Sequence, residues 1–375
     1  MKFNQLLSIM KTKLTLIIAA IALAACGKPQ IKLTFEGMES DNIVVVTTAI
    51  KDIPKIEGDS DPRNKVDTIK IENNKVIIPV AEYPSVYTIF IDDNRIFAIT
   101  TPDDRLTYKV KNTENGFEYE ANGSDIVEGI SDYDEFVRPI MTQINSSPRE
   151  TQEDFDKIQE LRKQRNEMLA EWVGNNINNP AVIFILSQYA DYETILEFSP
   201  KIESLVKSSP IKEIFKSRVS EAEKYLAMKK AQESIIEGAI APNFTLNDNQ
   251  GKPFTLSTLR GKWVVLDFWG TWCGWCIKGI PEMKKYYAKL NKRCEFVSID
   301  CNEGKDKWLA GLKKYEMPWT QVYQPTDSTP YEDVSIMYGI SAFPTKIILT
   351  PEGTIHKIFV GETPDFYKEL DNVVK

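Results

Sequence analysis

Histidine is almost absent from this sequence, with one in 375 residues, and cysteine occurs only five times. A structural zinc site uses four ligands in paired spacing, whereas this chain offers one CxxC pair and His356. A cysteine protease would have only His356 as its base, and we expect that residue on the solvated face of a strand. A metal site and a cysteine protease are therefore disfavoured, and we expect no cofactor.

Positive charge is not in excess either, with 46 Lys and Arg against 54 Asp and Glu and a net charge of −8. Because non-specific nucleic-acid binding depends on clustered positive charge, nucleic acid is not an expected partner. The apolar run of residues 14–25 is shorter than the roughly 20 residues that a membrane-spanning helix needs. A chain of this length is expected to contain more than one domain.

Residues 1–25 have the composition of a targeting segment. Lys11 and Lys13 precede the apolar run, which ends in Leu-Ala-Ala before Cys26. This ending resembles a bacterial lipobox, which implies cleavage before Cys26, a lipid on Cys26 and a tether over residues 26–30, so that the protein is anchored to a membrane without crossing it. The alternative is an ordinary secretory peptide in which Cys26 has no role. In Bacteroidota lipoproteins, acidic residues after the cysteine tend to mark surface export, so the sequence GKPQ here favours a periplasm-facing protein of the cell envelope.

The most informative stretch is residues 264–276, which read VVLDFWGTWCGWC. Its apolar residues predict a buried parallel strand that contains Asp267 and is ended by Gly270. Apolar positions at helical spacing follow, so Cys273 is expected at a helix N-terminus, where free N–H groups and the helix dipole lower a thiol pKa from about 8.5 to roughly 3.5–7.5. Cys276 lies one turn later on the same face and can attack a mixed disulfide at Cys273. The pattern predicts a redox dithiol with Cys273 as nucleophile and Cys276 as resolving thiol.

From residue 238 to 375 the chain resembles the membrane-tethered, thioredoxin-like thiol-disulfide oxidoreductases of the TlpA and ResA type. The resemblance rests on GAIAPNFTL, GKPFTLSTLRGKWVVLDFWGTWC, Pro281 and YGISAFPTKIILTPEGTI. It implies an α/β thioredoxin-like domain, a central sheet flanked by helices. It also implies action on protein thiols and disulfides, with a membrane electron donor of the DsbD kind to recycle the dithiol.

The same resemblance assigns roles to residues around the dithiol. Asp267 would be the buried acid that assists Cys276, and Pro344 would be a cis-proline that faces the two cysteines. An apolar rim for substrate would consist of Trp272, Trp275, Phe343 and Pro344. Some family members carry a glutamate three residues after the second cysteine, where this chain has Gly279. Asp267 would then handle the proton alone.

Residues 31–123 alternate polar and apolar positions in short segments separated by turn signals such as Asn73-Asn74. This alternation predicts an antiparallel β-sandwich or barrel with one buried face. On DTIKIENNKVIIP and the pair Gly123-Ser124, the segment resembles the β-domain of unknown function (DUF4369-like) that often precedes thioredoxin-like domains in Bacteroidota lipoproteins. We interpret it as a passive spacer or docking module.

Residues 124–237 change to helical spacing and predict a helical bundle that links the two β-containing parts. Thr151 with Asp154 predicts one helix start and Asn179-Pro180 a second. Within residues 238–375 we expect a parallel strand over 294–300, a helix over 305–315 and a hairpin of strands over 345–349 and 354–360, which adds an antiparallel edge to the sheet.

Two further cysteines, Cys294 and Cys301, lie at the ends of one expected strand. At about 3.3 Å per residue they would be roughly 23 Å apart, too far for a disulfide. We expect Cys294 to be a small buried residue. Cys301 should emerge at the same sheet edge as Cys273, where a backup thiol is conceivable.

The sequence therefore predicts a membrane-anchored thiol-disulfide oxidoreductase that uses a Cys-Gly-Trp-Cys dithiol. The scarcity of histidine removes one route to a very acidic thiol, so a reductase or isomerase is favoured over an oxidase. Two alternatives stay open. One is an envelope binding module with a secondary redox role, and the other is a thiol peroxidase, whose family pattern has threonine where this chain has Gly270.

Overall fold

The computed structural model describes residues 28–55, 61–113 and 116–375. The predicted targeting segment and the predicted lipid anchor at Cys26 lie outside these residues. The chain divides into two compact units, Met1–Ala222 and Glu223–Lys375. Among the described residues, no helix combines the length and apolar composition needed to cross a membrane.

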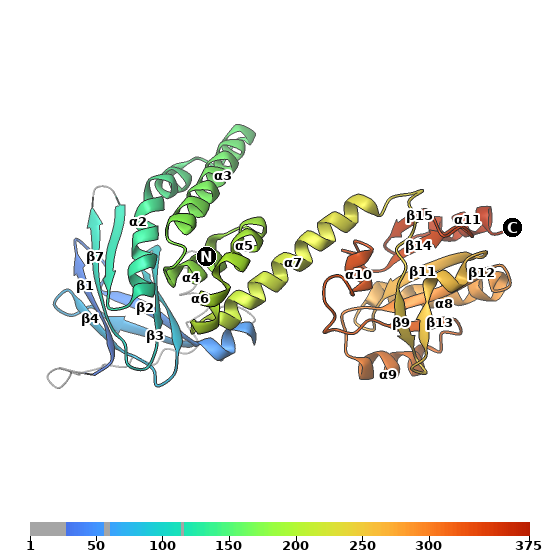
Figure 1. The fold of residues 1–375 in the computed structure, drawn as a ribbon, viewed down its shortest axis with the longest axis horizontal. Coiled ribbons are helices and arrows are strands. Elements are labelled where there is room, and N and C mark those ends of the chain that lie inside the picture. The colour runs from blue at the N-terminus through green and yellow to red at the C-terminus, as the bar shows by residue number, and fades with distance from the viewer. Residues whose placement is uncertain (1–27, 56–60, 114–115) are drawn as a thin grey trace. The chain divides into compact units, whose positions relative to one another are not determined.

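The first unit begins with eight strands (Figure 1). They are β1 (Gln30–Glu36), β2 (Asn42–Ala49), β3 (Lys65–Lys70), β4 (Lys75–Pro79), β5 (Ser85–Ile91), β6 (Asn94–Thr100), β7 (Arg105–Thr113) and β8 (Gly116–Asn122). They form two four-stranded sheets in the orders β4-β1-β7-β8 and β3-β2-β5-β6. Paired strands are antiparallel except β1 and β7, which are parallel. The predicted sandwich is confirmed, with this one parallel pair as a difference.

The two sheets share one apolar core, which includes Leu33 of β1 and Val45 of β2. Strand β6 is covered on both of its faces. Its residue Ile96 faces the core between the sheets, and Phe97 packs into the core formed by the helices. The expectation of one buried face does not hold for β6, since the helical region covers its second face.

The helices of the first unit are α2 (Asp125–Ser146), α3 (Gln152–Asn175), α4 (Ala181–Tyr189), α5 (Tyr192–Phe198), α6 (Glu203–Ser208) and α7 (Lys212–Ser234), and α7 continues into the second unit. Helices α2 and α3 lie side by side (Figure 1). The predicted start of α3 is confirmed, because the Thr151 hydroxyl accepts from the Asp154 amide and the Asp154 carboxylate accepts from the Thr151 amide. Helix α4 is buried around most of its circumference, as its apolar sequence requires.

The second unit contains one seven-stranded sheet in the order β10-β9-β13-β12-β11-β14-β15. Its strands are β9 (Thr245–Asp248), β10 (Pro253–Thr255), β11 (Trp263–Trp269), β12 (Cys294–Asp300), β13 (Thr320–Tyr323), β14 (Thr345–Leu349) and β15 (Ile355–Val360). Strands β11, β12 and β13 are parallel, and the hairpin β14-β15 continues the sheet in antiparallel fashion. The expected parallel strands and antiparallel hairpin are confirmed.

Helices cover both faces of this sheet. They are α8 (Gly274–Leu290), α9 (Lys305–Tyr315), α10 (Val334–Met337) and α11 (Pro364–Val373). Met283 of α8 and Phe366 of α11 share a core with Val265 of β11 on one face. Val334 of α10 packs with Leu266 on the other face. This arrangement confirms the predicted α/β fold and places the start of α8 at the carboxyl end of β11.

Candidate active site

The two cysteines of the CxxC motif lie where β11 ends and α8 begins. Cys273 is the N-cap residue of α8, and a disulfide joins it to Cys276, with 5.3 Å between their Cα atoms. The Sγ atom of Cys273 accepts a hydrogen bond from the backbone N–H of Cys276 at 3.1 Å. A free N–H in the first turn of a helix is the group that a capping acceptor satisfies. Both cysteines are only 6% exposed in this oxidised form.

Aromatic side chains surround the disulfide. The Phe343–Pro344 peptide bond is cis, as the resemblance implies, and Phe343 packs against the cluster that contains both cysteines. The ring of Trp272 meets Phe343 edge-on with 5.1 Å between centroids, and its Nε1 donates to the Cys301 carbonyl at 2.9 Å. Trp272 and Trp275 are 50% and 64% exposed.

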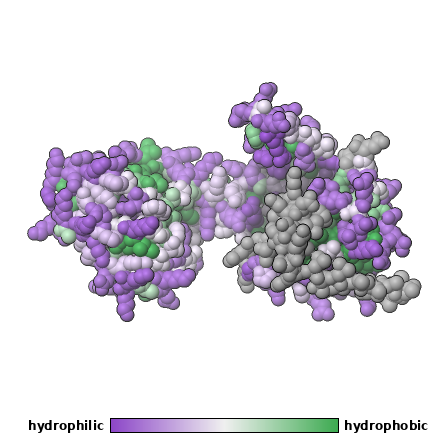
Figure 2. Space-filling view, turned by 180° about the vertical axis from the view of Figure 1, so that it is seen from behind, coloured by the Kyte–Doolittle hydropathy of each residue, from purple (hydrophilic) through white to green (hydrophobic). Residues whose placement is uncertain are grey.

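These indoles are among the large apolar side chains that are exposed in the described part of the chain. The face drawn in Figure 2 is mainly hydrophilic, and hydrophobic residues reach its surface only in small areas. Two exposed tryptophans next to a buried disulfide provide large apolar contact area with a polar N–H at one end. Phe343 packs against the cluster that contains both cysteines and contacts Trp272, and Trp275 lies between the two cysteines in sequence. The roles of these residues and of Pro344 in substrate binding stay predictions.

One row of residues across the central sheet is polar although it is buried. The strand registers align Gln321, Ser298, Asp267 and Lys346 as successive neighbours on the face that α8 covers. The Ser298 hydroxyl donates to Asp267 Oδ2 at 2.8 Å and accepts from Trp319 Nε1 at 2.8 Å. Burial raises the pKa of the Asp267 carboxyl, and the nearby Lys346 ammonium lowers it by less.

Asp267 has two charged neighbours, while the expectation that it alone handles the proton of Cys276 stays a prediction. The Lys346 ammonium is 2.6 Å from Glu362 Oε2 and 3.9 Å from Asp267 Oδ1, and Lys346 is only 2% exposed. Glu362 Oε1 also accepts from the Tyr367 hydroxyl at 2.7 Å. Neither Lys346 nor Glu362 was identified from the sequence as a neighbour of Asp267. A lysine inside a strand expected to be buried was the available signal, since a buried lysine requires a partner, whereas Glu362 follows Gly361 in a loop and carries no such signal.

A second acidic pair lies at the end of β12, and one of its members, Glu303, holds the loop in front of Cys273. Glu303 is buried, and its carboxylate accepts from both the backbone N–H and the hydroxyl of Thr271. Asp300 lies beside it at the end of β12. Burial and the neighbouring Glu303 carboxylate raise the pKa of Asp300 to about 9. Neither acid was identified from the sequence.

The remaining thiols are separate from the dithiol. Cys294 and Cys301 are free and buried, and burial raises the pKa of both, to about 12 for Cys294. Cys301 belongs to the core on the face of the sheet opposite to the Cys273 cluster. The idea of a backup thiol at Cys301 has no support in this geometry.

We expected His356 on the solvated face of a strand, but the structure does not place it there. It is half-buried, and its Nε2 lies 2.7 Å from Glu369 Oε1. Across residues 28–55, 61–113 and 116–375, no three His, Cys, Asp or Glu side chains are grouped as a metal ion would require.

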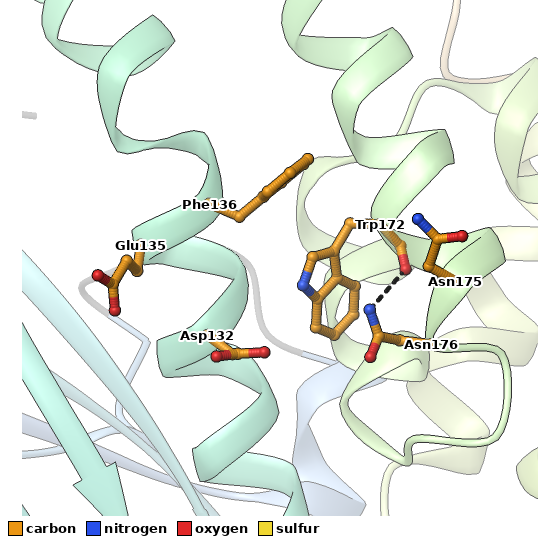
Figure 3. Close-up of a pocket in the computed structure, with 6 residues that line it drawn as sticks. All are labelled: Asp132, Glu135, Phe136, Trp172, Asn175 and Asn176. Carbon is orange, nitrogen blue, oxygen red and sulfur yellow. Dashed lines mark hydrogen bonds between the residues drawn. The ribbon is translucent and has the colours of Figure 1, made fainter.

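A hollow of about 380 Å³ lies in the first unit (Figure 3). Its lining comes from α2, from α3 and from the residue that follows α3. The lining residues are Asp132, Glu135, Phe136, Trp172, Asn175 and Asn176. Asp132 points toward the Trp172 ring, and Asn176 Nδ2 donates to the Trp172 carbonyl at 2.9 Å (Figure 3). Because Trp172 is buried against Tyr133, its indole is part of the helical core. No thiol lines this hollow, so the redox chemistry belongs to the second unit.

Comparison with known proteins agrees with this placement. The model of the AhpC/TSA family matches residues 238–358. The thiol-disulfide oxidoreductase ResA of Bacillus subtilis is 36% identical over 153 residues, which are 40% of this chain and 83% of that protein. ResA of Bacillus cereus is 30% identical over 126 residues, 33% of this chain and 70% of that protein.

Among solved structures, the thioredoxin domain of a thiol-disulfide oxidoreductase from Bacteroides vulgatus is 29% identical with a TM-score of 0.34, and the match covers 38% of this chain and all of that one. The identity to ResA extends over most of the ResA chain, and the AhpC/TSA family model covers the strand, the dithiol and the helix described above. The chain therefore belongs to the ResA-like family of thioredoxin-fold thiol-disulfide oxidoreductases.

Proposed function

We propose that this oxidoreductase is a reductase of protein disulfides in the cell envelope, anchored to a membrane through Cys26 and facing the periplasm. The observation that carries the proposal is the Cys273–Cys276 disulfide at the N-terminus of α8, with exposed tryptophans and the Phe343 ring beside it. An extended protein segment can contact such an apolar rim while its own disulfide reaches Cys273. Lipidation of Cys26 rests on the sequence, since that residue lies outside the described part of the chain.

In the proposed reaction, the Cys273 thiolate attacks one sulfur of a substrate disulfide. A mixed disulfide forms, and the other substrate sulfur leaves as a thiolate that takes a proton. Cys276 then loses its proton to Asp267 and attacks the Cys273 sulfur. The second substrate sulfur leaves with the electron pair and is protonated, so two electrons have passed from the dithiol to the substrate. The Cys276 N–H that caps Cys273 Sγ would also stabilise the Cys273 thiolate in the reduced protein.

The oxidised enzyme must be reduced again before a second turnover. We propose a membrane electron donor of the DsbD kind as the partner, because exposed tryptophans next to the disulfide offer a contact surface and the predicted anchor holds the protein at a membrane. A protein disulfide would be the substrate and a protein dithiol the product.

The decisive measurement is the equilibrium reduction potential of the Cys273/Cys276 pair in the chain carrying Cys26→Ser. Thiol-disulfide buffers would set the potential, and thiol alkylation would report the reduced fraction. We expect a value near about −250 mV or below, in the range of reductants such as thioredoxin at about −270 mV. A value above roughly −180 mV would contradict the reductase assignment and indicate an isomerase or oxidase.

A trapping experiment tests the roles of the two cysteines. Cys276→Ser should accumulate mixed disulfides with envelope proteins, because the resolving attack is removed, and Cys273→Ser should accumulate none. Physiological activity that persists in Cys273→Ser would instead favour a binding module in the first unit.

A thiol peroxidase is the second candidate, because the AhpC/TSA family model matches residues 238–358. Rapid oxidation of the reduced dithiol by hydrogen peroxide, at a rate comparable with that of a protein disulfide, would favour this candidate. We expect slow oxidation, since Gly270 stands where the peroxidase pattern has threonine.

A further inference from the structure

An ion pair lies beside the carboxyl group proposed to take the proton of Cys276. Lys346 in β14 is the register partner of Asp267 in β11, so their side chains lie on the same face of the sheet. The Lys346 ammonium is nevertheless closer to Glu362, at 2.6 Å, than to Asp267, at 3.9 Å. Glu362 follows β15 and reaches back over the sheet to make this contact.

Glu362 also lies against the helix that carries Cys276. A Cβ atom added at Gly279 would overlap the Glu362 carboxylate. Gly279 and Cys276 are both buried and three residues apart in α8, so they share one face of the helix. The Glu362 carboxylate therefore lies one helical turn from Cys276, on the side that faces the sheet.

The charges in this small buried group do not balance. Asp267 and Glu362 supply two carboxyl groups, and Lys346 supplies one ammonium, at side-chain exposures of 10%, 18% and 3%. One buried cation can compensate one buried anion. Because the ammonium is closer to Glu362, it compensates Glu362 first, and Asp267 is the group that is left to carry a proton.

We propose that Glu362 and Lys346 are positioning residues that set the proton affinity of Asp267 in opposite directions, and thereby the pH at which Cys276 can give up its proton. This inference rests on the proposed function, in which Asp267 accepts that proton. Glu362 raises the proton affinity by drawing the ammonium away, and Lys346 lowers it by its charge. The other titratable groups within electrostatic reach of Asp267 are Tyr367 of α11 and Cys301, which follows β12 and lies on the opposite face of the sheet. Cys276 of α8 is the group whose proton Asp267 is proposed to accept.

The test follows the two steps of oxidation separately, in the full-length chain with Cys26→Ser. The reduced protein is mixed with excess dithiobis(nitrobenzoate) in a stopped-flow instrument between pH 4 and 9. Attack by Cys273 releases one nitrothiobenzoate and leaves the other bound as a mixed disulfide. Attack by Cys276 on Cys273 then releases the second and closes the Cys273–Cys276 disulfide, so the second phase reports the resolving step.

The rate constant of the second phase, plotted against pH, should fall on the acid side, and this fall is the acid limb. Glu362→Gln should move the acid limb to lower pH by about one unit, because the ammonium then pairs with Asp267. Lys346→Met should move it to higher pH by about one unit, because Asp267 loses its cation. Lys346→Arg keeps the charge and should restore a limb close to that of the parent chain. The matched control is Asp371→Asn in α11, which removes a surface ion pair with Lys289 and should leave the limb unchanged.

The opposite signs separate this role from a merely structural one, since a loosened core would slow the step in both variants without moving the two limbs apart. Suppose that the first phase has its normal rate, but the acid limb stays fixed or moves in the same direction in both variants. This result would overturn the inference and leave the proposed function standing. If the parent chain showed no first phase that depends on Cys273, both the proposed function and the inference would be overturned.

Discussion

Several carboxyl groups of the second unit are buried. Asp267 and Asp300 both lie on the α8 side of the sheet, and burial is the first cause that raises the pKa of each. Glu303 is buried too, but its carboxylate accepts two hydrogen bonds from Thr271.

Asp300 provides a prediction of pH dependence. Its folded pKa of about 9 lies above the value of 3.8 for a free carboxyl, so its contribution to stability is fully present below about pH 4 and is lost as the pH rises through about 9. Asp300→Asn mimics the protonated acid and should be more stable than the parent chain at pH 8, by at least about 1.4 kcal/mol, the equivalent of one pKa unit. The difference should vanish toward pH 4.

Denaturant unfolding at pH 4, 6 and 8 checks this, with Asp371→Asn on the surface as the control. An Asp300→Asn variant that is less stable than the parent at pH 8 would show that the Asp300 carboxyl is ionised and stabilising there.

At the scale of elements, the active-site loop is held by close packing of α9. Gly311 of α9 lies so near the Thr271 side chain that an added Cβ would overlap its methyl group. Thr271 cannot move away without loosening its two hydrogen bonds to Glu303. Small side chains at such a contact let a helix approach a loop that carries catalytic residues.

Gly311→Ala should therefore destabilise the second unit by about 1–3 kcal/mol, although alanine favours a helix. Gly174→Ala in α3 is the matched control, because an added Cβ there meets no atom within 4 Å, and it should stabilise the first unit by up to about 1 kcal/mol. Calorimetry of each variant measures whether the substitution lowers or raises the stability of its unit. A stabilised Gly311→Ala protein would mean that the loop can shift freely.

At the scale of the whole molecule, the redox site is contained in the second compact unit, Glu223–Lys375. The last part of α7 belongs to this unit, since Gln232 Nε2 donates to the Gly339 carbonyl at 3.2 Å and Ile235, directly after the helix, lies in the core of the unit. The first unit has its own two cores.

A fragment of residues 223–375 should therefore fold and react with dithiobis(nitrobenzoate) at the rates of the full chain, within about twofold. Its reduction potential should also be unchanged, because the groups that surround the dithiol all lie within it. A fragment that folds but reacts differently would show that the first unit influences the dithiol. Loss of activity on envelope proteins alone would assign substrate docking to the first unit.

The sequence by itself determined the dithiol and most elements around it. The bounds of β12, α9 and β14 agree with those expected, and so does the start of α3, because alternation, helical spacing and capping are local properties of the chain. The lipid anchor at Cys26 and the domain boundaries at residues 123 and 237 stay predictions.

Only the tertiary structure decided which polar side chains meet. Strand register places Lys346 beside Asp267, a loop more than ninety positions along the chain from Asp267 brings Glu362 to Gly279, and side-chain alternation directs Cys301 to the face opposite the dithiol. The parallel pairing of β1 with β7 is of the same kind. Such contacts depend on long-range pairing and on which face each side chain occupies, and a one-residue change in register would reverse them.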